Sequence, residues 1–317
     1  MNQTAIAKYG LKAASLLYLK EHGFFPKKLL VLDYLPSFNE FQDLLAQSGL
    51  SNVPFGIRFS PRNPQLCIKS KHWITDINSA YKFLKEYAHQ GAAIIQEHTN
   101  PYMMGMLYFG KDALFINVVP GTWASSACDS CDIIEIGENI IYHKYTKNRH
   151  ALYAVEHGFE PRIAPPFSQA QIEKLITLFR GLLPKLAILH KERMMIEFIV
   201  DENYHFIAME MKKSKQAIIN DKPSSTKDLF EVNKASDLTQ WDKKSDLLIA
   251  IKLGREHPPE FFSMIDIIKQ HKDRVYIKYG LLSHPAILLR EKGIKTIQYA
   301  QDYGGLCRIS RIVYSRE

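Results

Sequence analysis

The sequence predicts an α+β module followed by a small α/β unit, and three observations lead to this fold class. Residues 54–109 alternate short β-rich runs with a single helical stretch. Residues 166–212 combine one long amphipathic pattern with two apolar strands, and residues 246–298 alternate strands with helices. Because 317 residues exceed the usual size of one hydrophobic core, more than one domain is expected.

The N-terminal half begins with a helix, a turn and a strand. Leucines recur on a near-helical period between residues 11 and 19, Gly23 and Pro26 favour a turn, and LLVLDY has the composition of a buried strand. Further strands are expected at PFGIRFS, AAIIQEH and GMLYFG, with a helix at INSAYKFLKEYAHQG that ends at Gly91. These runs predict a mostly antiparallel α+β arrangement.

The next segment predicts a long helix and a hairpin. Ser168 is a suitable N-cap for the helix QAQIEKLITLFRGLLPKLAILH, which Pro184 is expected to break or kink. Two strands follow, MMIEFIVD and YHFIAMEMK, joined by a polar turn around Glu202 and Asn203. This hairpin carries two carboxylates on otherwise apolar strands.

The C-terminal third predicts a tether and a separate small domain. Residues 213–245 lose strong periodicity and are rich in Lys, Ser and Asp, so we predict a linker. Residues 246–317 then form an α/β unit with strands at DLLIAIKL, RVYIKYG and KTIQY and helices at PPEFFSMIDIIKQH and from Pro285 onwards.

Composition limits the classes of function. The net charge is +8, yet the lysines are scattered and no basic run is interleaved with aromatic residues, so an anionic small substrate is favoured over nucleic acid. The start of the chain lacks the pattern of a signal peptide and no segment is long and apolar enough for a membrane span, so we expect a cytoplasmic protein with reduced cysteines. Cys128 and Cys131 form a lone CxxC pair without the two further ligands of a structural zinc site, and their role stays open.

His284 is the first candidate for chemistry. It precedes Pro285, which suits the first turn of a helix, so His284 is predicted to lie at a helix N-terminus. The free N–H groups and partial positive charge there favour a phosphate bonded to the imidazole, and a neutral imidazole is a competent nucleophile near pH 7. A histidine that only caps the helix is the alternative that these residues leave open.

The segment YGLLSHPAILLREKGI resembles the swivelling phosphohistidine domain of the phosphoenolpyruvate synthase and pyruvate phosphate dikinase family. The residues that match this motif in order are Gly280, Ser283, His284, Ala286, Arg290, Glu291, Gly293 and Ile294. Tyr279 and Pro285 depart from it. The resemblance implies that His284 accepts phosphate from ATP.

The same family places an ATP-grasp nucleotide-binding module before that domain, and residues 1–212 resemble it as two subdomains. The opening YGLKAASLLYL is similar to the family's Gly-Gly-Lys start, which implies that Lys12 contacts the nucleotide phosphates. FGIRFS is similar to the Val-Arg-Ser-Ser strand and implies the same for Arg58, for which a structural ion pair is the alternative. AAIIQEH implies that Gln96 and Glu97 hold the adenine and ribose.

The hairpin IEFIVDENYHFIAMEMK resembles the family's paired strands that hold Mg²⁺. The resemblance implies that Glu197 and Glu210 bind the metal, and that Lys212, at an arginine position of the family, contacts the nucleotide. Glu210 itself occupies a glutamine position of the family. The cofactors implied are therefore ATP and Mg²⁺.

These matches imply an ATP-dependent phosphotransferase of the dikinase type, with Lys12, Arg58, Lys212 and His284 as its catalytic residues. The stretch after Arg58, SPRNPQLCIKSKHWIT, lacks the glycines of the family's phosphate-covering loop; Lys69, Ser70 and Lys71 are its polar candidates, and Gly121 and Thr122 are weaker ones. The chain shows no acceptor domain, so we expect an unidentified small-molecule acceptor or a partner protein that supplies the acceptor site. The alternative is a degenerate ATP-grasp protein that binds nucleotide, or regulates a partner, without turnover; an acyl-phosphate ligase is disfavoured because it needs no His284.

Overall fold

The fold is α+β and divides into two compact units, described in a computed structural model. Unit 1 comprises residues 1–102, 153–160 and 196–212, and unit 2 comprises residues 103–152, 161–195 and 213–317. The structure describes residues 3–61, 70–109, 114–121, 131–137, 140–145, 149–155, 158–190, 194–213, 229–251, 259–278, 284–299 and 303–309. No helix in the described part of the chain is long and apolar enough to cross a membrane.

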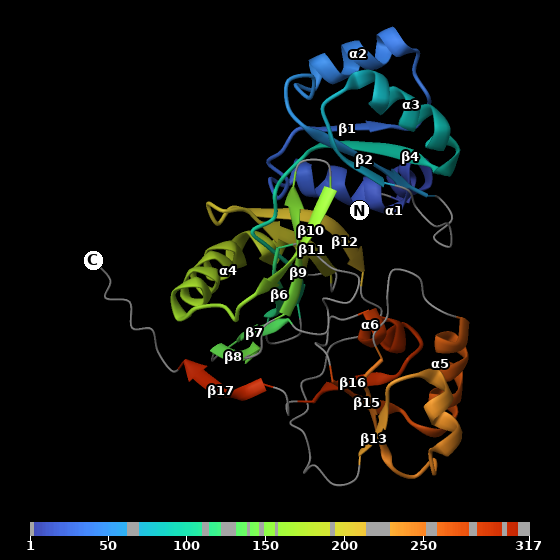
Figure 1. The fold of residues 1–317 in the computed structure, drawn as a ribbon, viewed down its shortest axis with the longest axis vertical. Helices are drawn as coiled ribbons and strands as arrows, with labels where there is room; N and C mark the ends of the chain where they lie inside the picture. The colour runs from blue at the N-terminus through green and yellow to red at the C-terminus, as the bar shows by residue number, and fades with distance from the viewer. Residues whose placement is uncertain are drawn as a thin grey trace. The chain divides into compact units, whose positions relative to one another are not determined.

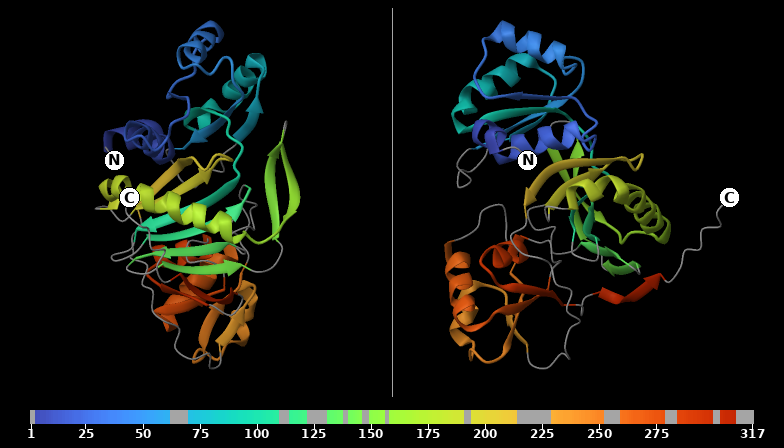
Figure 2. Two further views of the ribbon diagram at one scale, coloured as in Figure 1. Left: turned by 90° about the vertical axis from the view of Figure 1, so that its left-hand side faces the viewer. Right: turned by 180° about the vertical axis from the view of Figure 1, so that it is seen from behind.

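Unit 1 contains an antiparallel sheet with helices on both faces (Figures 1 and 2). Its strands occur in the order β1-β4-β2-β3, with bounds β1 Leu29–Leu32, β2 Phe55–Ser60, β3 Ser70–Ile74 and β4 Ala92–Glu97. Helices α2 (Phe38–Gln47) and α3 (Ile77–Tyr87) begin at the side-chain caps Ser37 and Asp76, and the short 3-10 helix η1 (Ala88–Gln90) follows α3. Their apolar faces cover one side of the sheet and form the core of this unit.

Helix α1 (Gln3–Glu21) lies on the other face of that sheet and is bent at Gly10. Gly10 has φ +76°, and a Cβ atom there would lie 2.6 Å from Ser60 Oγ and 2.8 Å from the Pro61 carbonyl oxygen, so only glycine fits. After the bend, the Ala13 N–H donates to Ser60 Oγ at 3.0 Å. The end of β2 therefore fixes the start of the second part of α1.

The predicted hairpin is present as β11 (Met194–Val200) and β12 (Phe206–Lys213), which are neighbouring strands. Asp201 closes its turn by accepting hydrogen bonds from the N–H groups of Asn203 and His205. Two backbone N–H groups of strand β12 donate to other parts of unit 1. The Ala208 N–H donates to the Phe24 carbonyl at 2.9 Å, and the Met211 N–H donates to Ser15 Oγ at 3.3 Å.

Unit 2 contains an antiparallel run of strands in the order β5-β6-β7-β8-β17. Their bounds are β5 Met103–Phe109, β6 Leu114–Pro120, β7 Asp132–Ile136, β8 Ile140–Tyr145 and β17 Tyr303–Ile309. Helix α4 (Gln169–His190) has the predicted Ser168 cap, and it continues past Pro184 to His190 rather than ending there. Strands β9 (Arg149–Val155) and β10 (Gly158–Ala164) pair in a two-stranded sheet of their own.

The small C-terminal part of unit 2 has a parallel sheet in the order β13-β14-β15-β16. Its elements are β13 Leu229–Val232, β14 Asp246–Ile249, α5 Pro259–His271, β15 Arg274–Ile277, α6 His284–Glu291 and β16 Lys295–Gln298. Residues of α5 and α6 pack with the sheet in one core. Within the segment predicted to be a linker, β13 and the 3-10 helix η3 (Ala235–Gln240) belong to this fold, while residues 214–228 lie outside the described residues.

Helix α6 also packs against the antiparallel strands of unit 2. Ile287 lies against a buried cluster formed by Met106, Tyr108, Phe115 and Met195. Arg290 is 4% exposed and donates from Nη1 to Thr296 Oγ1 at 2.7 Å. Burial lowers the pKa of Arg290 to about 10, so the side chain stays charged at neutral pH. This helix is therefore fixed on two sides by packing within its own unit.

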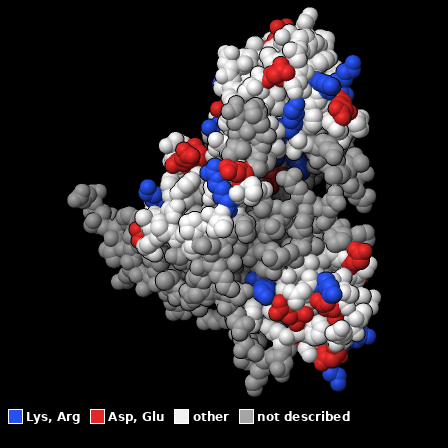
Figure 3. All heavy atoms as spheres, viewed as in Figure 1, with Lys and Arg blue, Asp and Glu red and all other residues white. Residues whose placement is uncertain are grey.

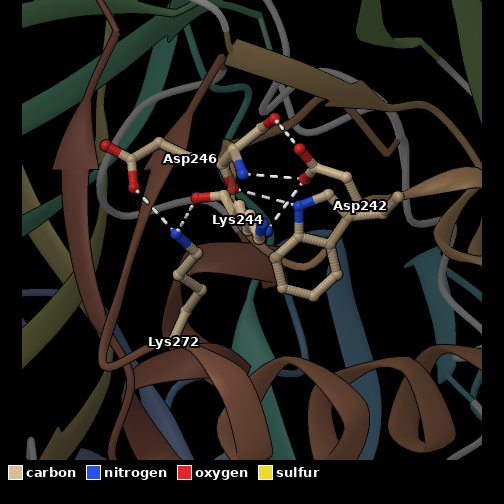
Figure 4. A network of polar contacts seen from close by, with 6 residues as sticks. Asp242, Lys244, Asp246 and Lys272 are labelled. Carbon is tan, nitrogen blue, oxygen red and sulfur yellow. Dashed lines mark hydrogen bonds and ion pairs between the residues drawn. The ribbon is translucent and has the colours of Figure 1, made fainter.

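A polar network ties the segment before β14 to the end of α5 (Figure 4). Asp242 Oδ1 accepts from the N–H groups of Lys244 and Ser245, both at 2.8 Å. Lys272 Nζ donates to the Lys244 carbonyl at 2.6 Å and lies 3.3 Å from Asp246 Oδ1. The Trp241 indole donates to the Ser245 carbonyl at 3.0 Å. Residues 241–246 are thus an ordered part of the small domain rather than a tether.

The Asp242 carboxylate is expected to make the stability of this small domain depend on pH. Hydrogen bonds from the Ser245 and Lys244 N–H groups lower the pKa of Asp242 below its ordinary value. The stabilisation is therefore fully present above the unfolded-state pKa of about 3.9 and is lost as the pH falls through the folded-state pKa. Asp242→Asn should show a smaller loss in urea midpoint from about pH 6 to about pH 3 than the wild type. Asp266→Asn, an exposed aspartate on α5, is the control, and equal losses in wild type and Asp242→Asn would contradict this account.

Candidate functional site

Three elements of unit 1 meet around the buried carboxylate of Glu210. This residue lies on β12 and its side chain is 3% exposed. Lys12 comes from the second part of α1, directly after the Gly10 bend, and its Nζ lies 3.3 Å from Glu210 Oε2. The Lys12 side chain is 34% exposed. A buried carboxylate is thus paired with a cation that also reaches solvent.

Arg58 joins the same group from β2. The side chains of Phe55, Ile57 and Phe59 point into the core that α2 and α3 cover. Because side chains alternate along a strand, Arg58 points to the opposite face, where α1 lies. Its Nη2 donates to the Met209 carbonyl, next to Glu210, at 2.8 Å. Its Nε is buried and has no hydrogen-bond partner among the described residues. A buried N–H donor lowers the stability of the fold unless an acceptor forms a hydrogen bond with it.

Gln96 shares the face of Arg58, whereas Glu97 does not. In the antiparallel register Arg58 is opposite Ile94 and Gly56 is opposite Gln96, so the Arg58 and Gln96 side chains are on one side of the sheet. Gln96 Oε1 is buried without a hydrogen-bond partner among the described residues. Glu97 alternates to the other side, and its Oε2 accepts from the Lys28 N–H at 3.2 Å.

The other residues predicted for the site are placed less completely. Glu197 is half-buried on β11, the strand beside β12. Lys212 lies on β12 and His284 is the first residue of α6, as predicted, but both side chains lie outside the described part of the structure. Lys12, Arg58, Gln96, Glu197 and Glu210 all belong to unit 1 and His284 belongs to unit 2.

Several residues of the segments that we considered for phosphate or metal contact lie outside the described residues. These are residues 62–69 of the glycine-free loop, together with Thr122 and Cys128. Lys71 is described, and its Nζ donates to Ser79 Oγ at the start of α3. Cys131 is buried and is not in a disulfide. In the described part of the chain, no group of three or more His, Cys, Asp or Glu residues could hold a metal ion on its own.

Two serines that the sequence reasoning missed position the site. Ser60 receives the Ala13 N–H, and its carbonyl oxygen would lie only 2.2 Å from a Cβ atom at Gly91, which has φ +142°. Ser15 is fully buried on α1, where its Oγ donates to the Lys12 carbonyl at 2.9 Å and accepts from the Met211 N–H at 3.3 Å. A serine among the apolar residues of a helix face was the sequence signal that could have indicated this role for Ser15, because buried hydroxyl groups are usually hydrogen-bonded.

The chemistry available in unit 1 is the binding of an anion together with a cation. Lys12 and Arg58 supply two positive charges, and Glu197 and Glu210 supply two carboxylates on neighbouring strands. Over the described residues on the face shown in Figure 3, acidic and basic side chains are interspersed without a large region of one sign. The feature that distinguishes the candidate site is therefore its group of buried charged side chains, not an extended charged surface.

Comparison with known proteins finds low-identity likeness to solved structures. No family model and no curated protein matches the chain. Among solved structures, the chain is similar to D-alanine-D-alanine ligase from Coxiella burnetii, with 10% identity and a TM-score of 0.38 over 66% of this chain and 48% of that one.

Two further structures show the same level of likeness. D-alanine-D-alanine ligase from Bacillus anthracis complexed with ATP has 12% identity and a TM-score of 0.34 over 66% of this chain and 56% of that one. Macrocyclase MdnC from Microcystis aeruginosa MRC, bound with precursor peptide MdnA, has 10% identity and a TM-score of 0.33 over 67% and 55%. The chain thus spans about half the length of these structures, and likeness at these TM-scores does not assign a reaction.

Proposed function

We propose that unit 1 binds ATP together with Mg²⁺. The observation that carries the proposal is the convergence of Lys12, Arg58 and the buried Glu210 from α1, β2 and β12. A contribution to stability does not by itself explain buried opposite charges, because the cost of removing them from water offsets most of their attraction. Binding of an anionic nucleotide and a divalent cation would explain why these charged residues are placed together.

Each residue has a role that its contacts support. Lys12, a point charge on a mobile stem, and Arg58, with its unpartnered Nε, neutralise the phosphates. Gln96 offers a buried acceptor on the face of Arg58 for a polar group of the nucleoside, and Glu97 fixes the neighbouring Lys28 backbone. Lys212 is a further candidate cation for the phosphates from the end of β12.

The carboxylates fit Mg²⁺ better than a metal held by protein alone. Magnesium is usually bound through one or two carboxylates, with water and substrate phosphates completing its shell. Glu210 and Glu197, on the adjacent strands β12 and β11, are the two carboxylates that we assign to this role, and no group of three or more potential ligands occurs among the described residues. When bound, Mg²⁺ would neutralise charge on the phosphates and orient them.

We further propose that the phosphoryl group passes to the imidazole of His284, which makes the protein an ATP-dependent phosphotransferase. His284 begins α6, where backbone N–H groups and the helix dipole favour a phosphorylated imidazole. In this reaction the imidazole attacks the β-phosphorus of ATP, so that a P–N bond forms as the bond to the α-phosphate oxygen breaks and AMP leaves. Water then cleaves the terminal phosphate from the pyrophosphorylated imidazole, which gives inorganic phosphate and phosphohistidine. The acceptor is an unidentified small molecule, bound by this chain or by a partner protein.

Phosphorylation of His284 is tested with Mg²⁺ and β-labelled ATP, because the γ-phosphate of ATP leaves as inorganic phosphate. We expect acid-labile, alkali-stable label on the wild type and none on His284→Ala. His257 supplies the matched control, because it also precedes a proline, in the run IKLGREHPP that parallels IKYGLLSHP, and His257→Ala should keep the label. Label that persists in His284→Ala, or never forms while Mg²⁺·ATP still binds, would leave the nucleotide-binding alternative; acyl phosphate formed on an added substrate would indicate a ligase.

A further inference from the structure

The pairing of Lys12 with Glu210 has a close counterpart on the same helix. Lys8 Nζ lies 3.3 Å from Asp33 Oδ2, the same separation as Lys12 Nζ from Glu210 Oε2. The surroundings differ, because Lys8 and Asp33 are 52% and 28% exposed while Glu210 is 3% exposed. The Glu210 carboxylate is therefore the more deeply buried of the two.

A carboxylate as buried as Glu210 must be neutralised whether or not a metal is bound. Without a metal, the Lys12 ammonium provides positive charge 3.3 Å from the Glu210 Oε2 atom. Arg58 lies nearby, and its Nη2 donates to the Met209 carbonyl. Lys12 and a divalent cation therefore compete for the same carboxylate, since binding both would crowd like charges at close range.

Because Lys12 is partly exposed to solvent, its ammonium group can move away from Glu210. Its side chain is 34% exposed and its stem is flexible, so the ammonium can leave Glu210 when a phosphate offers an alternative partner. Glu210 itself is held on β12, whose neighbour Met211 is bonded to Ser15. The carboxylate is the fixed partner of the pair and the lysine is the movable one.

We propose that Lys12 occupies Glu210 in the absence of nucleotide, so that a divalent cation binds this site well only when nucleotide phosphate draws Lys12 away. Lys12 is then a gate on metal binding as well as a phosphate contact. The inference rests on the proposed Mg²⁺·ATP site and adds to it the order of events. Metal alone is rejected, and the metal–nucleotide complex is accepted.

Titration of Mn²⁺ into nucleotide-free protein, with free Mn²⁺ measured by electron paramagnetic resonance, tests this gate. Lys12→Met and Lys12→Gln should each bind Mn²⁺ about tenfold more tightly than the wild type, because the competing ammonium is gone. Lys8→Met, the matched control, should bind as the wild type does. Lys12→Arg keeps the positive charge and should also bind metal weakly, whereas Glu210→Gln added to Lys12→Gln should abolish the gain.

A second titration, with a non-hydrolysable ATP analogue present, separates the two proposals. Nucleotide should raise Mn²⁺ affinity strongly in the wild type and less in the two neutral Lys12 variants. If these variants bind Mn²⁺ alone no more tightly than the wild type while Glu210→Gln still prevents Mn²⁺·nucleotide binding, the gate is wrong and the site stands. If the analogue does not bind the wild type, the proposed function itself is wrong. Thermal unfolding of each variant establishes that it is folded before titration.

Discussion

Glutamine in place of Glu210 is expected to weaken the binding of Mg²⁺·ATP at least about a hundredfold, because residues one shell further from a metal are already worth ten- to a hundredfold. The substitution keeps the size of the buried side chain and removes the charge that would hold the cation. It also frees Lys12, whose side chain can be solvated, so the fold should survive. Isothermal titration calorimetry with Mg²⁺·ATP measures the effect.

The comparison variant for this substitution is Glu202→Gln. Glu202 is exposed in the turn between β11 and β12. The substitution Glu202→Gln therefore changes the net charge of the hairpin by the same amount as Glu210→Gln, but at a position outside the site. It should bind Mg²⁺·ATP like the wild type. An affinity in Glu210→Gln within a factor of about three of the wild type, a difference below 1 kcal/mol, would remove Glu210 from the metal site.

Alanine in place of Arg58 is expected to weaken ATP binding about a hundredfold, since truncating one member of a buried charged pair typically costs 2–5 kcal/mol. The guanidinium donates one hydrogen bond to the Met209 carbonyl, and its Nε has no hydrogen-bond partner in the part of the chain that the structure describes. Lysine at this position restores the charge but not the planar fork, so Arg58→Lys should recover only part of the affinity. Calorimetric titration with ATP and with adenosine measures both.

Adenosine is the internal control for Arg58. It lacks phosphates, so its affinity should be similar in wild type, Arg58→Lys and Arg58→Ala if the guanidinium binds phosphate. Equal losses for adenosine and ATP would show instead that Arg58 only holds β12 in place through Met209.

The regular elements of the fold follow from local pattern. Capping residues, apolar periodicity and glycine turns predict α3, α4 and the strands β1, β2 and β4 within a few residues of their observed ends, whereas β3 lies in a stretch that we expected to be a loop. Strand β17 and the short strand β13 are defined by partners distant in sequence, β8 and β14, so local pattern did not indicate them. Pro184 is tolerated within α4, although the local rule expects a break.

The candidate site is predictable in its residue types and less so in its arrangement. The charges of Lys12, Arg58 and Glu210 are apparent from their places in the motifs, and all three meet in unit 1. Gln96 and Glu97 were predicted together, but strand alternation sends their side chains to opposite faces. The Gly10 bend, which aims Lys12 at Glu210, depends on contact with Ser60 from a different element and has no local signature.

Amide hydrogen exchange with and without a non-hydrolysable Mg²⁺·ATP analogue tests most directly whether unit 1 holds the nucleotide. Exchange should slow in the peptides that carry the site, namely residues 8–16, 55–60, 92–98 and 206–211. Protection limited to residues 229–298, or no binding at millimolar nucleotide, a free energy weaker than about −4 kcal/mol, would contradict a nucleotide site built on Lys12, Arg58 and Glu210.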